Sequence, residues 1–335
     1  MAKKALKTKS QGPTEIAILL YHDYQPSAVY GLMDLFEIAN RFVAEHLPQE
    51  KRFIRISHWK VKGAKKPEME CVLDTHPDLG PSKPSFILIP PSLNRLISPD
   101  AASPFAEWVL KHHKSGVSVC SVCSGAFVLG ETGLLNGRNA TTHWLFKDEF
   151  TNRFPKVDLQ IEKLVIDDGD ILTAGGLMAW IDLGLKLVDR LFGSTVMVQT
   201  ARFMLVDPPG REQRFYSNFA PQLHHGDEQI VKVQHWLQGT GAQGATLRLM
   251  ADKAGMEERT FIRRFKKATS LNPTEYCQQV RVAKAREMLE FTNKNIEEIS
   301  WKVGYEDSSA FRKVFHKVIG LTPGEYRSKF SVISR

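Results

Sequence analysis

The last ninety or so residues of the chain, roughly a quarter of it, contain the same sequence pattern twice. From Phe261 onward, the two copies run in step at an offset of 50 residues. The residues that recur are Phe261, Phe265, Lys267, Leu271, Pro273, Glu275 and Tyr276 in the first copy and Phe311, Phe315, Lys317, Leu321, Pro323, Glu325 and Tyr326 in the second. A repeat of this kind predicts one supersecondary unit that is used twice.

Each copy has the pattern of a helix-turn-helix: a short apolar helix, a glycine turn and a basic helix. Gly255 and Gly304 stand at the turns, where a small residue is needed. The helix after each turn has phenylalanines at i and i+4, which lie on one inner face of a helix. The pattern is typical of a DNA reader, whose second helix enters the major groove. The alternative is a helical bundle with a solvated basic face.

The outer face of the second helix would carry the DNA contacts in each copy. The candidate DNA-binding residues are Arg259, Thr260, Arg263, Arg264 and Lys267 in the first copy and Ser308, Ser309, Arg312, Lys313 and His316 in the second. Arginine can bond guanine bidentately, whereas lysine and serine more often bind phosphates. Between the copies, Asn272-Pro273 begins a predicted helix that ends near Phe291. This helix would hold two readers about 34 Å apart, one turn of B-DNA.

Positive charge is concentrated in the C-terminal part of the chain. The 335 residues carry a formal net charge of +8. Residues 225–335 contain 19 Lys+Arg and 13 Asp+Glu, a balance of +6, so the remaining 224 residues carry +2. A basic domain joined to a near-neutral one suggests double-stranded DNA as the partner of the basic domain.

Composition argues against several other classes of protein. No apolar run approaches the roughly 18 residues of a membrane span, so no membrane association is expected. The lysine-rich N-terminus is not followed by an apolar run and does not resemble a secretory signal. The four cysteines are too few for a disulfide scaffold. A reducing cytoplasm is therefore the expected location.

In the first two thirds of the chain, short apolar runs alternate with helical patterns. The expected strands are 16–20, 86–89 and 117–122, and the expected helices are 27–45, 102–114, 126–132 and 180–192. This alternation predicts an α/β fold with a parallel sheet sandwiched by helices, followed by an all-α domain with two helix-turn-helix units. We divide the chain into a flexible basic tail at 1–13, an α/β domain at 14–206, a linker at 207–226 and a DNA-binding domain at 227–335.

The segment Val119 to Ala126 has the pattern of a nucleophile elbow, in which a strand turns sharply into a helix. Small residues such as Ser124 and Gly125 let this turn close around Cys123. The helix dipole should acidify a thiol at this place. Cys120 lies within the strand and is expected to be a packed core residue. A disulfide between Cys120 and Cys123 has little support, and without a second ligand pair we predict no metal site and no cofactor.

His143 lies twenty residues beyond Cys123, and two interpretations of it stay open. It could be the basic partner in a Cys–His pair, or a histidine at a helix N-terminus bonded to backbone. In the predicted fold, a small-molecule pocket would lie at the C-terminal edge of the sheet. The candidate pocket residues are Pro91, Cys123, Ser124, Gly125, His143 and Gly175.

Residues 228–330 resemble the AraC/XylS family of transcription regulators. The most specific stretch is the second copy, which runs from Ile296-Glu297-Glu298-Ile299 through Val303-Gly304-Tyr305 to Leu321-Thr322-Pro323-Gly324-Glu325-Tyr326-Arg327. Ile262 departs from the family pattern, because members often place a polar base-contacting side chain there. The resemblance implies sequence-specific DNA binding, with RNA polymerase as a further partner.

Residues 16–206 resemble the class I glutamine amidotransferase-like superfamily that includes the PfpI-type intracellular proteases, and above all its branch fused to AraC-type readers. The resemblance rests on Cys123-Ser124-Gly125-Ala126-Phe127-Val128-Leu129, on Gly133-Leu134-Leu135-Asn136-Gly137-Arg138 with Ala140-Thr141-Thr142-His143-Trp144, and on Thr173-Ala174-Gly175-Gly176 with Ile181-Asp182-Leu183. It implies a flavodoxin-like, amidotransferase-like sheet.

Two departures from catalytic members of that superfamily bear on activity. Such members place an acid after the first strand, where this chain has Ala28. They also follow a later strand with a Pro-Gly-Gly turn, where this chain has Pro90-Pro91-Ser92. Proline has no N–H to donate to an oxyanion, and an unassisted thiol lacks a general-base partner. Both departures favour a binding pocket over an enzyme.

We therefore expect a cytoplasmic transcription regulator whose activity is controlled by a small-molecule effector bound near Cys123. A homodimer is expected, since a two-fold pair doubles the DNA footprint. The alternative is a cysteine-dependent hydrolase or hydratase fused to a DNA-binding domain.

Overall fold

The computed structural model describes residues 12–49, 51–63, 67–94, 96–208, 212–217 and 219–333. Most of the predicted tail, residues 1–11, lies outside the described residues. The chain divides into two compact units, Met1–Gln213 and Arg214–Arg335. This division falls within the segment 207–226, whose exact limits as a linker stay a prediction. No helix in the described ranges is long and apolar enough to cross a membrane.

The first unit is built on a seven-stranded sheet with the strand order β3-β2-β1-β4-β5-β9-β8. The strands are β1 (Thr14–Leu20), β2 (Ile54–Lys62), β3 (Glu68–Asp74), β4 (Phe86–Ile89), β5 (Ser118–Val122), β8 (Val165–Asp167) and β9 (Ile171–Ala174). The five central strands are parallel, and β3 and β8 pair antiparallel at the two edges. A separate pair is formed by β6 (Asn139–Ala140) and β7 (Asp158–Leu159).

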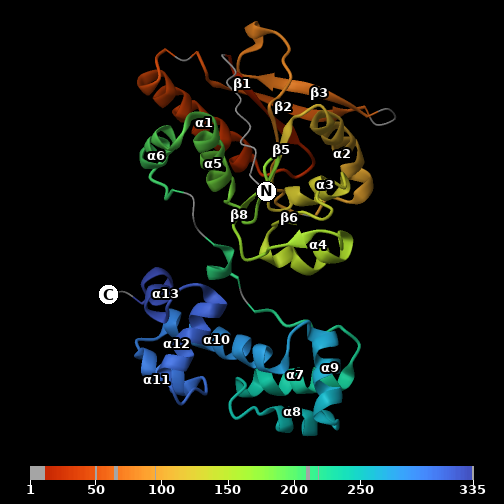
Figure 1. The fold of residues 1–335 in the computed structure, drawn as a ribbon, viewed down its shortest axis with the longest axis vertical. Helices are drawn as coiled ribbons and strands as arrows, with labels where there is room; N and C mark the ends of the chain where they lie inside the picture. Colours follow the sequence, from red (N-terminus) through yellow and green to blue (C-terminus); the bar gives the residue numbers. More distant parts are fainter. Residues whose placement is uncertain are drawn as a thin grey trace, which may run out of the picture. The chain divides into compact units, whose positions relative to one another are not determined.

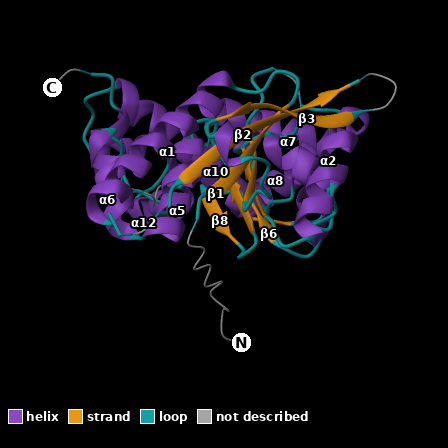
Figure 2. Cartoon of the chain, turned by 90° about the horizontal axis from the view of Figure 1, so that it is seen from above, coloured by secondary structure: helices purple, strands orange, loops and turns teal. Residues whose placement is uncertain are grey.

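Helices cover both faces of this sheet, as Figures 1 and 2 show. One face packs against α1 (Pro26–His46), α5 (Trp180–Phe192) and α6 (Ser194–Phe203), and the other against α2 (Pro99–Lys114) and α3 (Gly125–Glu131). The short helix α4 (Lys147–Arg153) follows β6. Successive side chains of β1 point to opposite faces, so Ile16 and Ile18 join the first core and Ala17 and Leu19 the second. The predicted sandwiched parallel sheet is confirmed.

Some elements of the first unit are not among those expected from the sequence. Strand β2 is the clearest case, because its first residues alternate between apolar Ile54 and Ile56 and polar Arg55 and Ser57. Such alternation is a strand signal. The predicted strands 16–20, 86–89 and 117–122 correspond to β1, β4 and β5.

The second unit is helical. It contains α7 (Glu228–Thr240), α8 (Leu247–Ala254), α9 (Glu258–Thr269), α10 (Pro273–Phe291), α11 (Ile296–Lys302), α12 (Ser308–Ile319) and α13 (Pro323–Phe330). Helices α7 to α9 and the first half of α10 enclose one hydrophobic core, and the second half of α10 encloses another with α11 to α13. Figure 1 shows α10 passing from one group of helices to the other. The two predicted helix-turn-helix units are thus α8–α9 and α11–α12.

Candidate functional sites: two DNA-reading helices and a cysteine elbow

Turn glycines, helix caps and buried phenylalanines define the two helix-turn-helix units. We call them the first reader (α8–α9) and the second reader (α11–α12). The turn glycines Gly255 and Gly304 have φ of +64° and +87°, a region that glycine enters without steric cost. Thr246 caps the start of α8 and Asp307 the start of α12, each accepting a backbone N–H. The four phenylalanine anchors, Phe261, Phe265, Phe311 and Phe315, are completely buried. Each second helix is therefore fixed with its opposite face outward.

That outward face carries most of the predicted DNA-binding residues. The exposed ones are Arg259, Thr260, Arg263 and Lys267 on α9 and Ser309, Arg312, Lys313 and His316 on α12, while Ser308 is half-buried. Lys266 is also exposed on α9 and belongs to the same basic surface, although the sequence pattern did not single it out. Base and phosphate contacts by these side chains stay predictions.

Arg264, which is also a predicted DNA-binding residue, makes an ion pair within the second unit, and its role at DNA stays a prediction. Its guanidinium binds the Asp227 carboxylate through two hydrogen bonds, Nε–Oδ2 at 2.9 Å and Nη2–Oδ1 at 2.7 Å. Asp227 also caps α7 by accepting from the N–H of Ile230. The Arg264 guanidinium holds the pKa of the Asp227 carboxyl below its usual range. Arg264 thus braces α9 against α7 and uses its Nε and Nη2 donors in this ion pair.

The first unit has the predicted elbow at the end of β5. Cys123 follows the strand with φ of +53°, a strained value for a non-glycine residue, and its side chain is 3% exposed. Its N–H donates to the carbonyl of Ala174 at 2.7 Å. Gly125 begins α3, and a Cβ there would lie 2.5 Å from the carbonyl oxygen of Ile89. Only glycine lets this turn approach the end of β4 so closely.

The thiol of Cys123 does not have the acidity that the helix dipole predicted. Burial raises its pKa to about 12. Desolvation of the thiolate outweighs the stabilising hydrogen bonds from the backbone and side chain of Ser124, and α3 has only 7 residues. The thiol is therefore protonated at neutral pH, and a protonated thiol is a poor nucleophile. Cys120 is fully buried within β5, as expected.

His143 follows the backbone-bonded interpretation. Its Nδ1 accepts a hydrogen bond from the N–H of Leu145 at 3.1 Å, which caps the short 3-10 helix Trp144–Phe146. Burial lowers the pKa of its imidazole. No hydrogen bond among the described residues joins it to Cys123.

The turn after β4 packs against the elbow through hydrogen bonds of its backbone. The N–H of Ser92 donates to Ser124 Oγ at 2.7 Å, and the carbonyl of Pro91 accepts from the N–H of Gln25 at 2.7 Å. Ser92 N–H is thus already used, and Pro91 has none to offer. Ala28 is buried in the core of the first unit, where catalytic relatives would place an acid.

The candidate pocket residue Gly175 is buried against the side chain of Gln213. A Cβ on Gly175 would lie 1.9 Å from Gln213 Nε2. Gln213 is 2% exposed, and its Nε2 lies 2.8–3.0 Å from the carbonyls of Thr142, Ile161 and Lys163 and from Thr141 Oγ1. The sequence gives no indication that Gln213 would be buried in this way, because it is a polar residue within the predicted linker.

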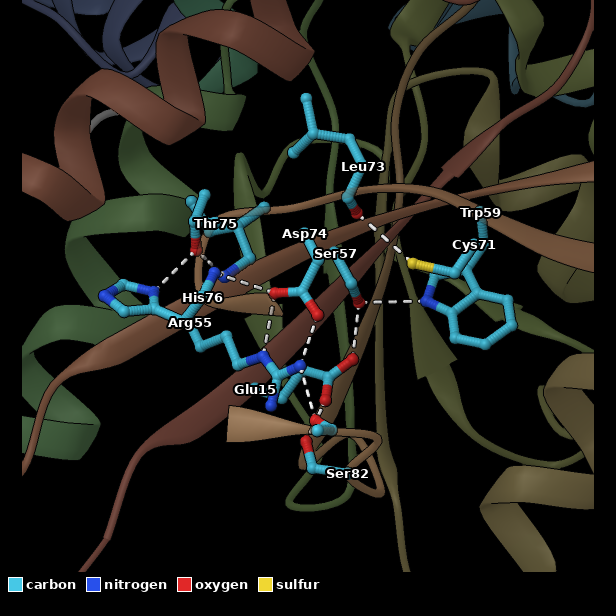
Figure 3. Close-up of polar contacts among 12 residues, drawn as sticks. Glu15, Arg55, Ser57, Trp59, Cys71, Leu73, Asp74, Thr75, His76 and Ser82 are labelled. Carbon is cyan, nitrogen blue, oxygen red and sulfur yellow. Dashed lines mark hydrogen bonds and ion pairs between the residues drawn. The ribbon is translucent and has the colours of Figure 1, made fainter. Parts of the chain in front are cut away.

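A second buried polar cluster lies at the opposite edge of the sheet, around the first residues of β1 (Figure 3). Arg55 binds both carboxylate oxygens of Asp74, which lowers the pKa of that carboxyl. Glu15 accepts from Ser57 Oγ at 2.5 Å and from Ser82 Oγ. Arg55, Asp74 and Glu15 each have protein partners, so the cluster joins β1, β2 and β3.

Comparison with known proteins identifies both units. Residues 250–329 match a family described as a helix-turn-helix domain, and residues 37–190 match the DJ-1/PfpI family. The chain is 28% identical over 235 residues to the HTH-type transcriptional regulator ArgR of Pseudomonas aeruginosa, which covers 69% of this chain and 71% of that protein. It is 27% identical over 223 residues to the regulator CdhR of the same organism, which covers 66% of each.

A shorter similarity connects the chain with an enzyme. It is 42% identical over 76 residues to an isonitrile hydratase of Pseudomonas putida, which covers 22% of this chain and 32% of that protein. The longer matches are to regulators, and they agree with the helix-turn-helix geometry of the second unit. The chain is therefore a DNA-binding transcription regulator of the AraC type that carries an N-terminal domain of the DJ-1/PfpI family.

Proposed function

We propose that DNA binding by this regulator is controlled by a small molecule that binds beside Cys123 in the first unit. The protein would act in the cytoplasm as a homodimer and influence RNA polymerase at its target promoters. In this proposal the first unit senses and does not catalyse.

The observation that carries the proposal is a chain of hydrogen bonds from the elbow to the end of the first unit. Thr142 Oγ1 donates to the carbonyl of Cys123 at 2.8 Å. The carbonyl of Thr142 in turn accepts from Gln213 Nε2 at 2.8 Å. Gln213 is the last residue of the first unit. A ligand that displaces the Cys123 backbone would therefore disturb the hydrogen bonds that hold the Gln213 side chain.

The next residues, Arg214 and Phe215, belong to the second unit and lie at the end of α12. Arg214 begins that unit, and its side chain and Phe215 fill the space next to Gly320. Gly320 ends α12, the second helix of the second reader. A movement of Gln213 would thus be transmitted along the backbone to Arg214 and Phe215, which pack at the end of α12. Coupling of this kind requires a ligand that prefers one of two states of the chain.

The proposal is tested with the full-length protein. A thermal-shift screen against a panel of polar metabolites identifies molecules that stabilise it, and DNA binding is then measured with and without each hit. We expect at least one hit to change DNA affinity at least 5-fold, in the usual range for allosteric coupling. Cys123→Ser should shift the ligand midpoint, whereas the matched control Cys71→Ser, at an exposed cysteine of the same unit, should not. If none of the stabilising metabolites changes DNA affinity, the proposal that a small molecule controls DNA binding is contradicted.

The second candidate function is a cysteine-dependent hydratase, which the similarity to isonitrile hydratase favours. The raised pKa of Cys123 and the buried Ala28 argue against it. Addition of water to a small alkyl isonitrile would give an N-alkyl formamide, which chromatography can quantify. Formamide production at about 1 per second or more, abolished in Cys123→Ala, would replace sensing by catalysis.

A further inference from the structure

We propose that Arg281 sets the separation of the two readers and thereby the spacing between the two DNA sites that the protein accepts. The inference rests on the DNA-binding function of the second unit. It concerns a residue in the connecting helix α10, away from the outward faces of α9 and α12.

Arg281 stands at the point where α10 passes from one hydrophobic core to the other. Cys277 and Val280 belong to the core of the first reader, and Val282 and Ala285 belong to the core of the second. The two cores share no buried apolar residue. Apolar packing therefore orders each reader separately, and the orientation of one reader to the other depends on α10 and on the polar contacts around it.

The Arg281 guanidinium joins both readers. Its Nε and Nη2 donate to the carbonyl of Ala242 at 3.2 and 2.8 Å, in the loop that precedes the first reader. Its Nη1 donates to the carbonyl of Gly304 at 3.1 Å, at the turn of the second reader. The guanidinium also lies over the ring of Tyr305, 5.2 Å from the ring centre. These bonds are charge-assisted, and the planar fork fixes their directions.

The two backbone segments that Arg281 contacts, the loop at Ala242 and the turn at Gly304, have specific conformations. Ala242 has φ of +55°, a narrow region for a residue with a side chain, and Gly304 has φ of +87°, which its lack of a side chain allows. Next to Ala242, Gln243 Nε2 donates to the carbonyl of Lys302, at the end of α11. The clamp thus consists of one arginine and one glutamine that tie the loop before α8 to the turn after α11. Loss of the arginine would leave α10 and the single hydrogen bond of Gln243 to connect the two readers.

Selection of DNA from a random duplex library tests the proposal with the full-length protein, because the operator is not needed beforehand. We expect the wild type to enrich pairs of sites at a single spacing of about one helical turn. Arg281→Lys keeps the charge but cannot bridge both carbonyls. This variant should enrich several spacings and bind the wild-type pair about 10-fold more weakly, while its affinity for a duplex with one site stays within 2-fold.

Arg286→Lys is the matched control, since it is the same substitution on the same helix. Arg286 donates to the hydroxyl of Tyr326 at 2.7 Å within the second core and does not bridge the readers. This variant should keep the wild-type spacing even where its melting temperature falls. A single unchanged spacing in Arg281→Lys, or an equal loss for one-site and two-site duplexes, would overturn the proposal. Enrichment of no duplex by the wild type would refute the DNA-binding function and this inference together.

Discussion

Removal of the Gln213 side chain tests the connection between the sensing unit and the rest of the chain. In Gln213→Ala, two amide hydrogens disappear from a site that is 2% exposed; the carbonyl of Ile161 loses its donor, and that of Thr142 keeps only a contact with Thr141 Oγ1 at 3.4 Å. Each hydrogen bond contributes about 0.5–1.5 kcal/mol, and a buried acceptor left unsatisfied costs about 1–3 kcal/mol. Lys163 keeps one partner, because Thr141 Oγ1 still donates to its carbonyl at 2.8 Å.

One unsatisfied acceptor and one lost hydrogen bond together predict that the free energy of unfolding of the first unit falls by about 1.5–4.5 kcal/mol. For a unit of this size the melting temperature should fall by roughly 3–18 °C. Differential scanning calorimetry of the full chain would measure this as a shift of one transition. Gln160→Ala is the matched control: its amide bonds the Asp158 carboxylate at 2.8 Å near the surface, and its loss should change stability by about 0.5 kcal/mol or less.

The functional consequence should exceed the effect on stability. At a temperature where Gln213→Ala is fully folded, a ligand that acts on the wild type should still bind the variant but should no longer change its DNA affinity. If the melting temperature is unchanged, the contacts of Gln213 contribute no net stability. If the ligand response is also intact, the coupling argued from this side chain is wrong.

The other predictions concern the readers and the sheet. Arg263→Ala and Arg312→Ala should each weaken binding to a selected site by about 1–3 kcal/mol and relax its sequence preference, which competition binding would detect; an unchanged preference would remove them from base recognition. Gly304→Val places a β-branched residue at φ +87° and should abolish second-site binding while the first unit keeps its melting transition; retained two-site binding would show that the turn tolerates a side chain. Burial lowers the pKa of His58, so its folded-state pKa is below the unfolded value of about 6.5. Stability is then full above pH ~6.5 and falls as pH drops below it, by at most about 1.4 kcal/mol per pH unit, and chemical denaturation of His58→Phe should show less of this loss; an identical pH dependence would exclude His58 as its source.

Several features of the protein follow from the sequence alone, because they depend on short-range chemistry. The repeat with its phenylalanines at i and i+4 specifies two readers, since helical periodicity decides which face is buried. Gly255 and Gly304 mark turns that need positive φ. The elbow around Cys123 is equally local, because it needs only a strand, small residues and a helix in succession. The short apolar runs similarly identify β1, β4 and β5.

Other features were decided by the tertiary structure, because they depend on partners far away in the sequence. The acidity of Cys123 follows from its burial, which no local motif specifies. Arg264 is ion-paired because folding brings it beside Asp227, 37 residues earlier in the chain. The Gln213 side chain is buried among residues that lie 38 to 72 positions away in the sequence, although the segment around it was predicted to be a linker. Long-range contacts of this kind arise only when the chain is folded, since sequence separation carries no information about which polar side chains will meet.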